Sequence, residues 1–199
     1  MSDRLLLLYA IARGNEFGFV DGPFKLMKIP FMAELASTSK QINTFNYSFF
    51  RWTFGPLTTD IYEDADWLAS VGLSSGKAKP RLTDKGTSLL RAASDLFQEN
   101  QEAIRFVDDA AKKCAPLTFG PLRTLVYKQV VNVPGKGKLT IADVPTGYNV
   151  LSRISTPKSC FSLSDDWIDS LWRHLNYTDD ECVSLRIEKP LDMRELVIQ

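Results

Sequence analysis

Few side chains in this sequence have the types and spacing that catalysis or metal binding requires. His174 is the single histidine, and it falls at the end of an expected helix, where a positive charge suits the helix dipole. Cys160, His174 and Cys182 are separated by thirteen and seven residues, which matches no usual spacing of zinc ligands. The segment PGKGKLT lacks the Gly-x4-Gly-Lys-Ser/Thr spacing of a phosphate-binding loop. The sequence therefore predicts no catalytic residue, no metal site and no cofactor, and it predicts that the protein is not an enzyme.

Acidic residues are concentrated in the stretch that follows Gly55-Pro56. No Lys or Arg lies between Arg51 and Lys77, and apolar residues recur at helical spacing, which predicts a helix with one buried stripe. We expect four acids to form its outer face, namely Asp60, Glu63, Asp64 and Asp66. Such a face can be merely solvated, or it can bind a basic protein partner. A carboxylate about 4 Å from a phosphate in water is repelled by roughly 1 kcal/mol, so this helix is not expected to enter a DNA groove.

Basic residues gather in two other segments. The turn-rich segment GLSSGKAKPRLTDKG, residues 72–86, predicts a β-hairpin wing that carries Lys77, Lys79, Arg81 and Lys85. The stretch from Ala110 to Ala142 has no acid and contains Lys112, Lys113, Arg123, Lys128, Lys136 and Lys138. These side chains can serve solubility, contact DNA phosphates or bind an acidic protein face, and the sequence leaves the three roles open.

Proline and glycine mark where the helices are expected to begin. Gly-Pro steps at residues 22–23, 55–56 and 120–121 predict three helix starts, because proline fits the first helical turn. The last two steps belong to a local repeat, since TFGPLTTDIYED (53–64) and TFGPLRTLVYKQ (118–129) agree at seven of twelve positions. Pro30 is expected to bend or split the helix that follows Pro23. Further helices are predicted near residues 3–13, 84–98, 100–113, 118–132 and 164–176.

Strands are expected to be short and to lie mainly after the Gly/Pro-rich break NVPGKGKLT. The segment FNYSFF (45–50) predicts a strand or a packed loop, and YNVLSRIS, VSLRI and ELVI predict strands. The order of elements predicts a mainly helical α+β fold. We expect a winged-helix-like domain over residues 1–133 and a mixed α/β C-terminal extension over residues 139–199.

Composition narrows the class of protein. The 199 residues carry 24 Lys plus Arg and 24 Asp plus Glu, so the net charge is zero, unlike that of proteins that coat nucleic acid or bind membrane surfaces. The three cysteines stand at unrelated spacings, which is typical of a reducing compartment. The apolar run LLLLYAIA (5–12) is too short to span a bilayer. We therefore expect a cytoplasmic protein without membrane contact.

Five short motifs of the first 90 residues resemble those of one known family. They are Lys25-Leu26-Met27-Lys28, Trp52-Thr53-Phe54-Gly55-Pro56, Asp60-Ile61-Tyr62-Glu63, Gly72-Leu73 and Leu82-Thr83-Asp84-Lys85-Gly86. In order and spacing the chain resembles the Panacea-type antitoxin and phage-associated protein family. Pro30 departs from that family's pattern, which usually continues a leucine-rich helix at this point. The resemblance implies a winged-helix-like α+β domain in an antitoxin or regulator that often binds another protein.

Together these observations predict a non-enzymatic, antitoxin-like regulatory protein that acts by protein–protein binding. The expected partner is a protein such as a cognate toxin, bound through the acidic face in the helix 56–72 region and through the C-terminal extension. The alternative is a winged-helix transcriptional regulator that contacts DNA through the basic wing and the 112–138 block. Both hypotheses leave a homodimer open.

Overall fold

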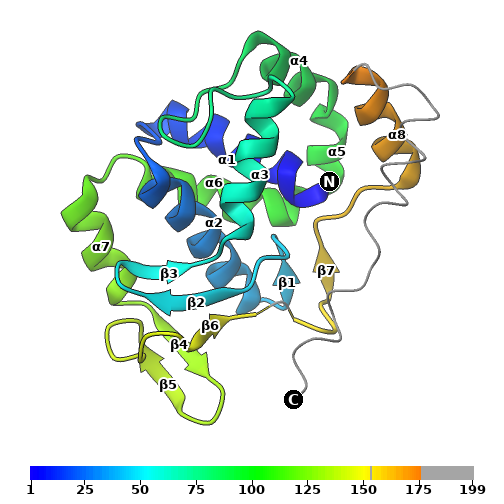
Figure 1. Ribbon diagram of the computed structural model, residues 1–199. Helices are drawn as coiled ribbons and strands as arrows, with labels where there is room; N and C mark the ends of the chain where they lie inside the picture. The colour runs from blue at the N-terminus through cyan, green and yellow to red at the C-terminus, as the bar shows by residue number, and fades with distance from the viewer. Residues whose placement is uncertain (153, 176–199) are drawn as a thin grey trace. The chain divides into compact units, whose positions relative to one another are not determined.

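Helices α1, α2 and α6 form the centre of the first compact unit in the computed structural model, which describes residues 1–152 and 154–175 (Figure 1). α1 (Ser2–Phe17) buries four consecutive leucines, residues 5–8, so it is apolar on several sides at once. α2 (Pro23–Thr38) packs against both α1 and α6 (Gln101–Cys114). A helix that is apolar around its circumference has to lie inside the protein, and this places α1 and α2 in the core.

α2 begins at Pro23 as the sequence predicts, and it continues through Pro30 as one helix. Of the two expected effects of Pro30, a split of the helix is therefore wrong. Pro30 removes one backbone N–H bond, but it is buried among the core helices, and packing on both sides stabilises the turn that lacks this bond.

In the described residues three small sheets accompany the helices, so the fold is α+β and mainly helical, as predicted. β2 (Phe49–Trp52) lies between β3 (Gly55–Leu57) and β6 (Asn149–Leu151), and both pairings are antiparallel. β4 (Val130–Val133) and β5 (Gly137–Thr140) form a hairpin, and β1 (Ile42–Asn43) pairs in parallel with β7 (Ser159–Cys160). β2 confirms that FNYSFF ends in a strand, and β6 confirms the strand within YNVLSRIS.

The Gly55-Pro56 step begins a strand and not a helix, so one of the three predicted helix starts is wrong. Gly55 has a φ of 98°, and Pro56 lies in β3, which is an edge strand of its sheet. An edge strand tolerates proline because it is hydrogen-bonded to another strand on one side only, and the position of the missing N–H can face away from the sheet. α3 (Asp60–Ser70) begins only after this strand. The second copy of the motif does open a helix, α7 (Phe119–Tyr127), with Gly120-Pro121 in its first turn.

The segments after α3 follow the predicted order with different boundaries. α4 (Asp84–Ala92) and α5 (Ser94–Glu99) divide the helix expected over residues 84–98, and α6 confirms the next one. α7 ends at Tyr127, so a helix reaching residue 132 is wrong: the valines of β4 favour a strand and pair with β5. The expected wing hairpin is reduced to one antiparallel bridge between Ser74 and Leu82.

The chain divides into two compact units, Met1–Ser162 and a second that begins at Leu163. In the second unit, α8 (Asp165–His174) confirms the predicted helix, and the Ser164 hydroxyl caps it by accepting a hydrogen bond from the Trp167 N–H at 3.3 Å. The strands expected at VSLRI and ELVI lie outside the described residues, as does the side chain of His174. The domain boundary expected between residues 133 and 139 stays a prediction, because a domain is defined by its ability to fold on its own. No helix of the described ranges is long and apolar enough to cross a membrane.

Candidate functional site

Helix α3 carries the four acids expected on an outer face, but Asp64 lies inside. It is 9% exposed and accepts hydrogen bonds from the Arg4 Nε and from the Tyr47 hydroxyl, both at 2.8 Å. Its predicted outward position is therefore wrong. The reason is that position 64 neighbours Ile61 and Leu68 on the helix surface, and this side of α3 packs toward α1.

The other three acids of α3 are exposed. Asp66 pairs with Lys77, whose Nζ lies 2.7 Å from its carboxylate, so its charge is balanced within the chain. Asp60 and Glu63 form no ion pair with any residue in the described ranges, and they suit the helix N-terminus where they stand. The acidic surface is thus reduced to these two residues, and its binding of a partner stays a prediction.

Three of the four basic residues of the expected wing are held by contacts within the chain. Lys77 binds Asp66, and Lys85 donates to the Val71 carbonyl at 3.2 Å. Arg81 donates to Asn15 and to the carbonyl of Pro80. For Lys79 no such side-chain contact occurs with a residue that the structure describes. Cations bound in this way are less free to contact phosphate, and DNA binding by the wing stays a prediction.

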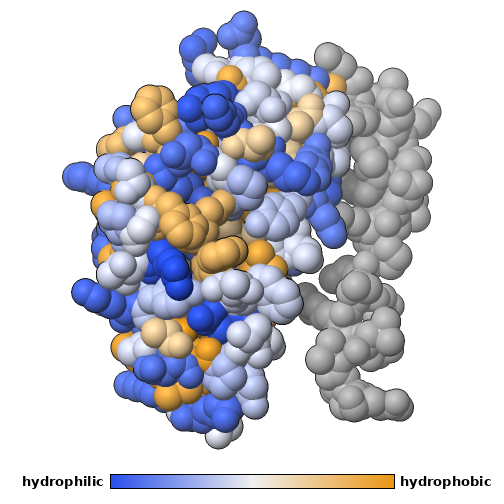
Figure 2. Space-filling model, turned by 60° about the vertical axis from the view of Figure 1, so that its left-hand side comes forward, coloured by the Kyte–Doolittle hydropathy of each residue, from blue (hydrophilic) through white to orange (hydrophobic). Residues whose placement is uncertain are grey.

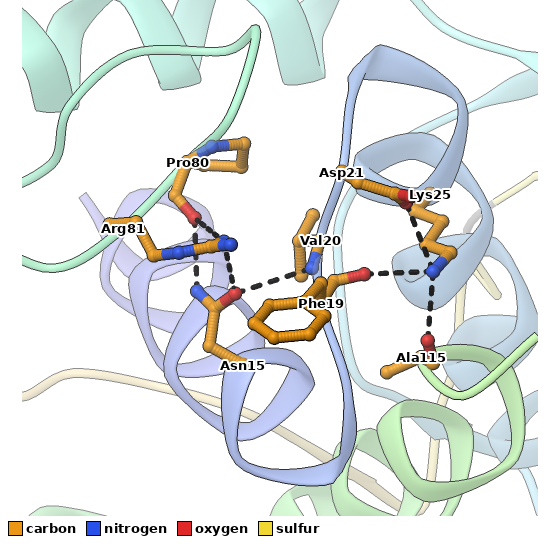
Figure 3. A network of polar contacts seen from close by, with 8 residues as sticks. All are labelled: Asn15, Phe19, Val20, Asp21, Lys25, Pro80, Arg81 and Ala115. Atoms are coloured by element: carbon orange, nitrogen blue, oxygen red, sulfur yellow. Dashed lines mark hydrogen bonds and ion pairs between the residues drawn. The ribbon is translucent and has the colours of Figure 1, made fainter.

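Arg81 belongs to a polar network centred on Asn15, near the end of α1 (Figure 3). The Asn15 Nδ2 donates to the Pro80 carbonyl at 2.9 Å, while its Oδ1 accepts from Arg81 and from the Val20 N–H at 3.2 Å. One amide side chain therefore ties the segment 72–86 to the loop between α1 and α2. These contacts account for the position of Arg81 without a ligand.

Lys25 forms the other half of the same network (Figure 3). Its buried ammonium donates to the carbonyls of Phe19 and Ala115, at 2.9 and 2.8 Å, and pairs with Asp21 at 3.0 Å. Three acceptors offset the unfavourable burial of its charge. The loop before α2 is thereby joined to the end of α6.

Several residues of the motifs that resemble the known family form contacts that hold helices and turns together. Lys28 donates to the Pro56 carbonyl, and Thr83 caps α4 by accepting from the Gly86 N–H at 3.1 Å. A Cβ on Gly86 would lie 2.2 Å from the Leu73 carbonyl oxygen, so only glycine fits there without a shift. These motif residues determine how helices and turns join, and they do not by themselves mark a binding site.

A group of aromatic rings lies where α7 meets the turn between β2 and β3. We call Phe24, Phe54, Phe119 and Tyr127 the aromatic surface. Phe54 is 53% and Phe119 49% exposed; their ring centres are 6.0 Å apart, and Phe119 lies 4.5 Å from Phe24. Figure 2, which brings this side of Figure 1 forward, shows apolar side chains gathered on the face with hydrophilic ones beside them. Trp52, on the same hairpin, is 49% exposed.

A hollow adjoins the aromatic surface and gives it a concave border. It is lined mainly by α7, including Phe119, Arg123 and Tyr127, and is completed by Lys128, Thr140 and Ala142. Concave sites that are mostly apolar and carry a few polar groups are typical of ligand contact.

Positive charge lies around and beneath the aromatic surface, and no carboxylate of a described residue pairs with it. The guanidinium carbons of Arg51 and Arg123 lie 4.8 and 5.0 Å from the centre of the Tyr127 ring. Arg51 is buried; its Nε donates to the Ile141 carbonyl, and its Nη1 has no hydrogen-bond partner among the described residues. Within the same ranges, neither arginine forms an ion pair, and nor does Lys128.

Lys28 adds a titratable group below Phe24. Its Nζ lies 4.9 Å from the centre of the Phe24 ring. Burial, and secondarily repulsion by Arg51, lowers the pKa of Lys28 to about 7. Charged and neutral forms of this amine therefore coexist near neutral pH.

The basic block of residues 112–138 is spread over three elements, and all six of its cations are exposed. Lys112 and Lys113 end α6, while Lys136 and Lys138 lie on the β4–β5 hairpin. Arg123 lies within α7, and Lys128 follows its last turn. The structure thus brings two of the six, Arg123 and Lys128, to the hollow beside the aromatic surface.

Metal-ligating and nucleophilic groups are scattered. No group of three or more His, Cys, Asp and Glu side chains in the described part of the chain is placed to hold a metal ion. Cys114 is buried, which raises the pKa of its thiol to about 12, and Cys160 is exposed. Cys182 lies outside the described residues. The expected absence of catalytic residues and cofactors stays a prediction.

Sequence reasoning missed the aromatic surface, although the TFGPL repeat was a signal for it. Phe54 and Phe119 hold the same place in the two copies, and their rings meet. Tyr127 of the second copy donates from its hydroxyl to the carbonyl of Thr53 in the first, at 2.9 Å. The two copies therefore contact each other, which the sequence interpretation of two separate helix starts did not anticipate.

Comparison with known proteins found no match: no protein-family model, curated protein or solved structure matches the chain. Function is therefore inferred from the residues of the chain itself.

Proposed function

We propose that this protein is a non-enzymatic, antitoxin-like regulatory protein that acts by binding another protein. The observation that carries the proposal is the aromatic surface, where Phe54 and Phe119 remain about half exposed. Aromatic side chains in contact with one another on a surface are frequent anchors of protein interfaces. The motifs of the first 90 residues support the antitoxin type, and a toxin encoded beside the protein is the partner that we propose.

A winged-helix-like arrangement is part of the same proposal. α3, the bridge between Ser74 and Leu82, and α4 follow one another in the order of helix, wing and helix. Asp60 and Glu63 on the exposed side of α3 would be repelled by phosphates. This supports a protein partner over insertion of α3 into a DNA groove.

Co-expression with the neighbouring open reading frame tests the proposal. We expect that frame to stop growth when expressed alone, and growth to return when this protein is present and co-purifies with the product. The double variant Phe54→Ser, Phe119→Ser should lose the rescue at an unchanged expression level. Phe19→Ser, which changes an exposed phenylalanine outside the aromatic surface, should retain it. A toxic product that this protein neither binds nor neutralises would contradict the proposal.

The acid-free stretch 110–142 favours a second candidate, a transcriptional regulator that contacts DNA through basic residues. Each phosphate contact steepens the fall of affinity with salt, by a slope of about −0.9 in log K against log salt concentration. Changing Lys77, Lys79 and Arg81 to Ala should then weaken duplex binding and flatten this dependence. Binding that does not respond to salt would exclude this candidate.

A further inference from the structure

We propose that the aromatic surface, with the hollow beside it, is the docking site for an acidic and partly apolar segment of a protein partner. This inference rests on the proposed function, because it specifies the chemistry of the partner that the function requires. The rings suit apolar side chains, and the unbalanced cations around Tyr127 suit carboxylates.

Charge complementarity selects the acidic occupant. Elsewhere in the described ranges Arg4, Arg13, Lys25 and Lys77 each pair with a carboxylate, while Arg81 and Lys85 donate to neutral acceptors. Arg51, Arg123 and Lys128 have no such partner within the described ranges. Asp143, the acid nearest to Lys128 in the sequence, accepts a hydrogen bond from the Thr140 hydroxyl at 2.5 Å. Arg123 and Lys128 are exposed and line the hollow, so an incoming carboxylate can pair with them, and the buried Arg51 adds its positive charge 4.8 Å from the Tyr127 ring.

The geometry of the rings favours a peptide over a single-stranded nucleic acid, which aromatic and basic residues also bind. Bases stack on rings that present open, roughly parallel faces. The rings of Phe54 and Phe119 are inclined at 74°, and those of Phe24 and Phe119 at 47°. Rings inclined in this way leave edges and recesses between them, which suit the side chains of a peptide better than a column of bases.

Selection of a random-peptide phage library on the full-length protein tests this chemistry. We expect enriched peptides to combine Asp or Glu with Phe, Trp or Leu. Synthetic copies should lose affinity by about tenfold or more on Arg123→Glu or Phe119→Ser, the range of an interface anchor. Arg91→Glu reverses an exposed arginine on α4 and is the matched control; it should change affinity by less than about twofold. Selection on the double variant Arg123→Glu, Lys128→Glu should enrich Lys and Arg instead.

Several outcomes would overturn the inference. The selection could enrich no peptides, or it could enrich peptides without an excess of Asp and Glu. Acidic peptides could also bind the Arg123→Glu variant with the same affinity as the unchanged protein. Oligothymidylate that binds in the same assay where the peptides fail would assign the surface to single-stranded nucleic acid. The remaining alternative occupant is the acidic run of the chain itself, Asp179, Asp180 and Glu181. If changing these three residues to Ser raises the affinity for the peptides, that run and not a partner occupies the docking site.

The docking site and the antitoxin function can be disproved independently of each other. If the neighbouring toxin is bound and neutralised equally by Arg123→Glu, the docking site is wrong and the proposed function stands. If acidic peptides bind at Phe119 and Arg123 but no toxin is neutralised, the docking site stands and the antitoxin function is wrong.

Discussion

Asp64 and Asp66 lie two residues apart on α3 and have opposite surroundings. Asp64 accepts from Arg4 and Tyr47 in a buried position, whereas Asp66 pairs with Lys77 at the surface. Asp64→Ala leaves a guanidinium and a hydroxyl without their acceptor, so we expect the free energy of unfolding to fall by about 2–4 kcal/mol. Asp66→Ala, the matched control, should lower it by at most about 1 kcal/mol. Urea unfolding measures both, and equal losses would contradict the burial of Asp64.

Lys28 makes stability depend on pH. Its pKa is lowered to about 7 in the folded protein, while a lysine in an unfolded chain titrates near pH 10.4. Between these values the unfolded state binds more protons, so the free energy of unfolding should rise with pH, by up to about 1.4 kcal/mol per unit. The Cys114 thiol, whose pKa is raised by burial, opposes this rise once an unfolded cysteine ionises above about pH 8.5.

The test is therefore urea unfolding between about pH 7 and pH 8.5, where only the lysine contribution is large. The unchanged protein should gain stability over this range. Lys28→Met should remove the gain, because methionine keeps the apolar stem and has no proton to lose. A rise of the same size in the variant would show that another group causes it.

At the scale of elements, α4 approaches the turn at Leu73 so closely that Gly86 has no room for a side chain. A Cβ there would lie 2.2 Å from the Leu73 carbonyl oxygen, and backbone atoms would have to move. We expect Gly86→Ala to lower the free energy of unfolding by about 1–3 kcal/mol. Gly120→Ala is the control, since nothing lies within 4 Å of its Cβ position and alanine favours the helix. An unchanged melting temperature for Gly86→Ala would contradict this packing.

Elements with signals in their own sequence were predictable. The apolar run in α1, the proline at the start of α2, and the acids in the first turn of α8 are local signals, and all three helices are found. Gly55-Pro56 was not predictable from local pattern, because pairing with β2 decides that it is a strand. The same holds for β4, whose valines became a strand through pairing with β5.

The candidate site was predictable only in part. Arg123 and Lys128 stand out in the sequence because the stretch around them has no acid. The aromatic surface depends on the meeting of Phe54 and Phe119, which are far apart in the chain; the TFGPL repeat gives them equivalent positions, but it does not report that their rings meet. Asp64 was misplaced for a related reason: its partners Arg4 and Tyr47 come from outside its helix.

At the scale of the whole molecule, two thiols should report how tightly the unit Met1–Ser162 is closed. Cys160 is exposed, while Cys114 is buried with its pKa raised to about 12. Iodoacetamide reacts with the thiolate. With Cys182 changed to Ser, we therefore expect one fast-labelling thiol and one that reacts only when the unit opens. Mass spectrometry over time counts the labels, and urea should make both fast. Two fast thiols without urea would contradict a closed unit.

The amine of Lys28, 4.9 Å from the centre of the Phe24 ring and with its pKa lowered by burial to about 7, makes binding at the docking site depend on pH. A carboxylate arriving at the aromatic surface would favour the ammonium form, so docking would take up a proton from the buffer. Titration calorimetry of an acidic peptide in phosphate and in Tris should then give different apparent enthalpies, and Lys28→Met should give the same enthalpy in both. Recognition at this surface would strengthen as the surroundings acidify, and equal enthalpies in the unchanged protein would show that no proton is exchanged.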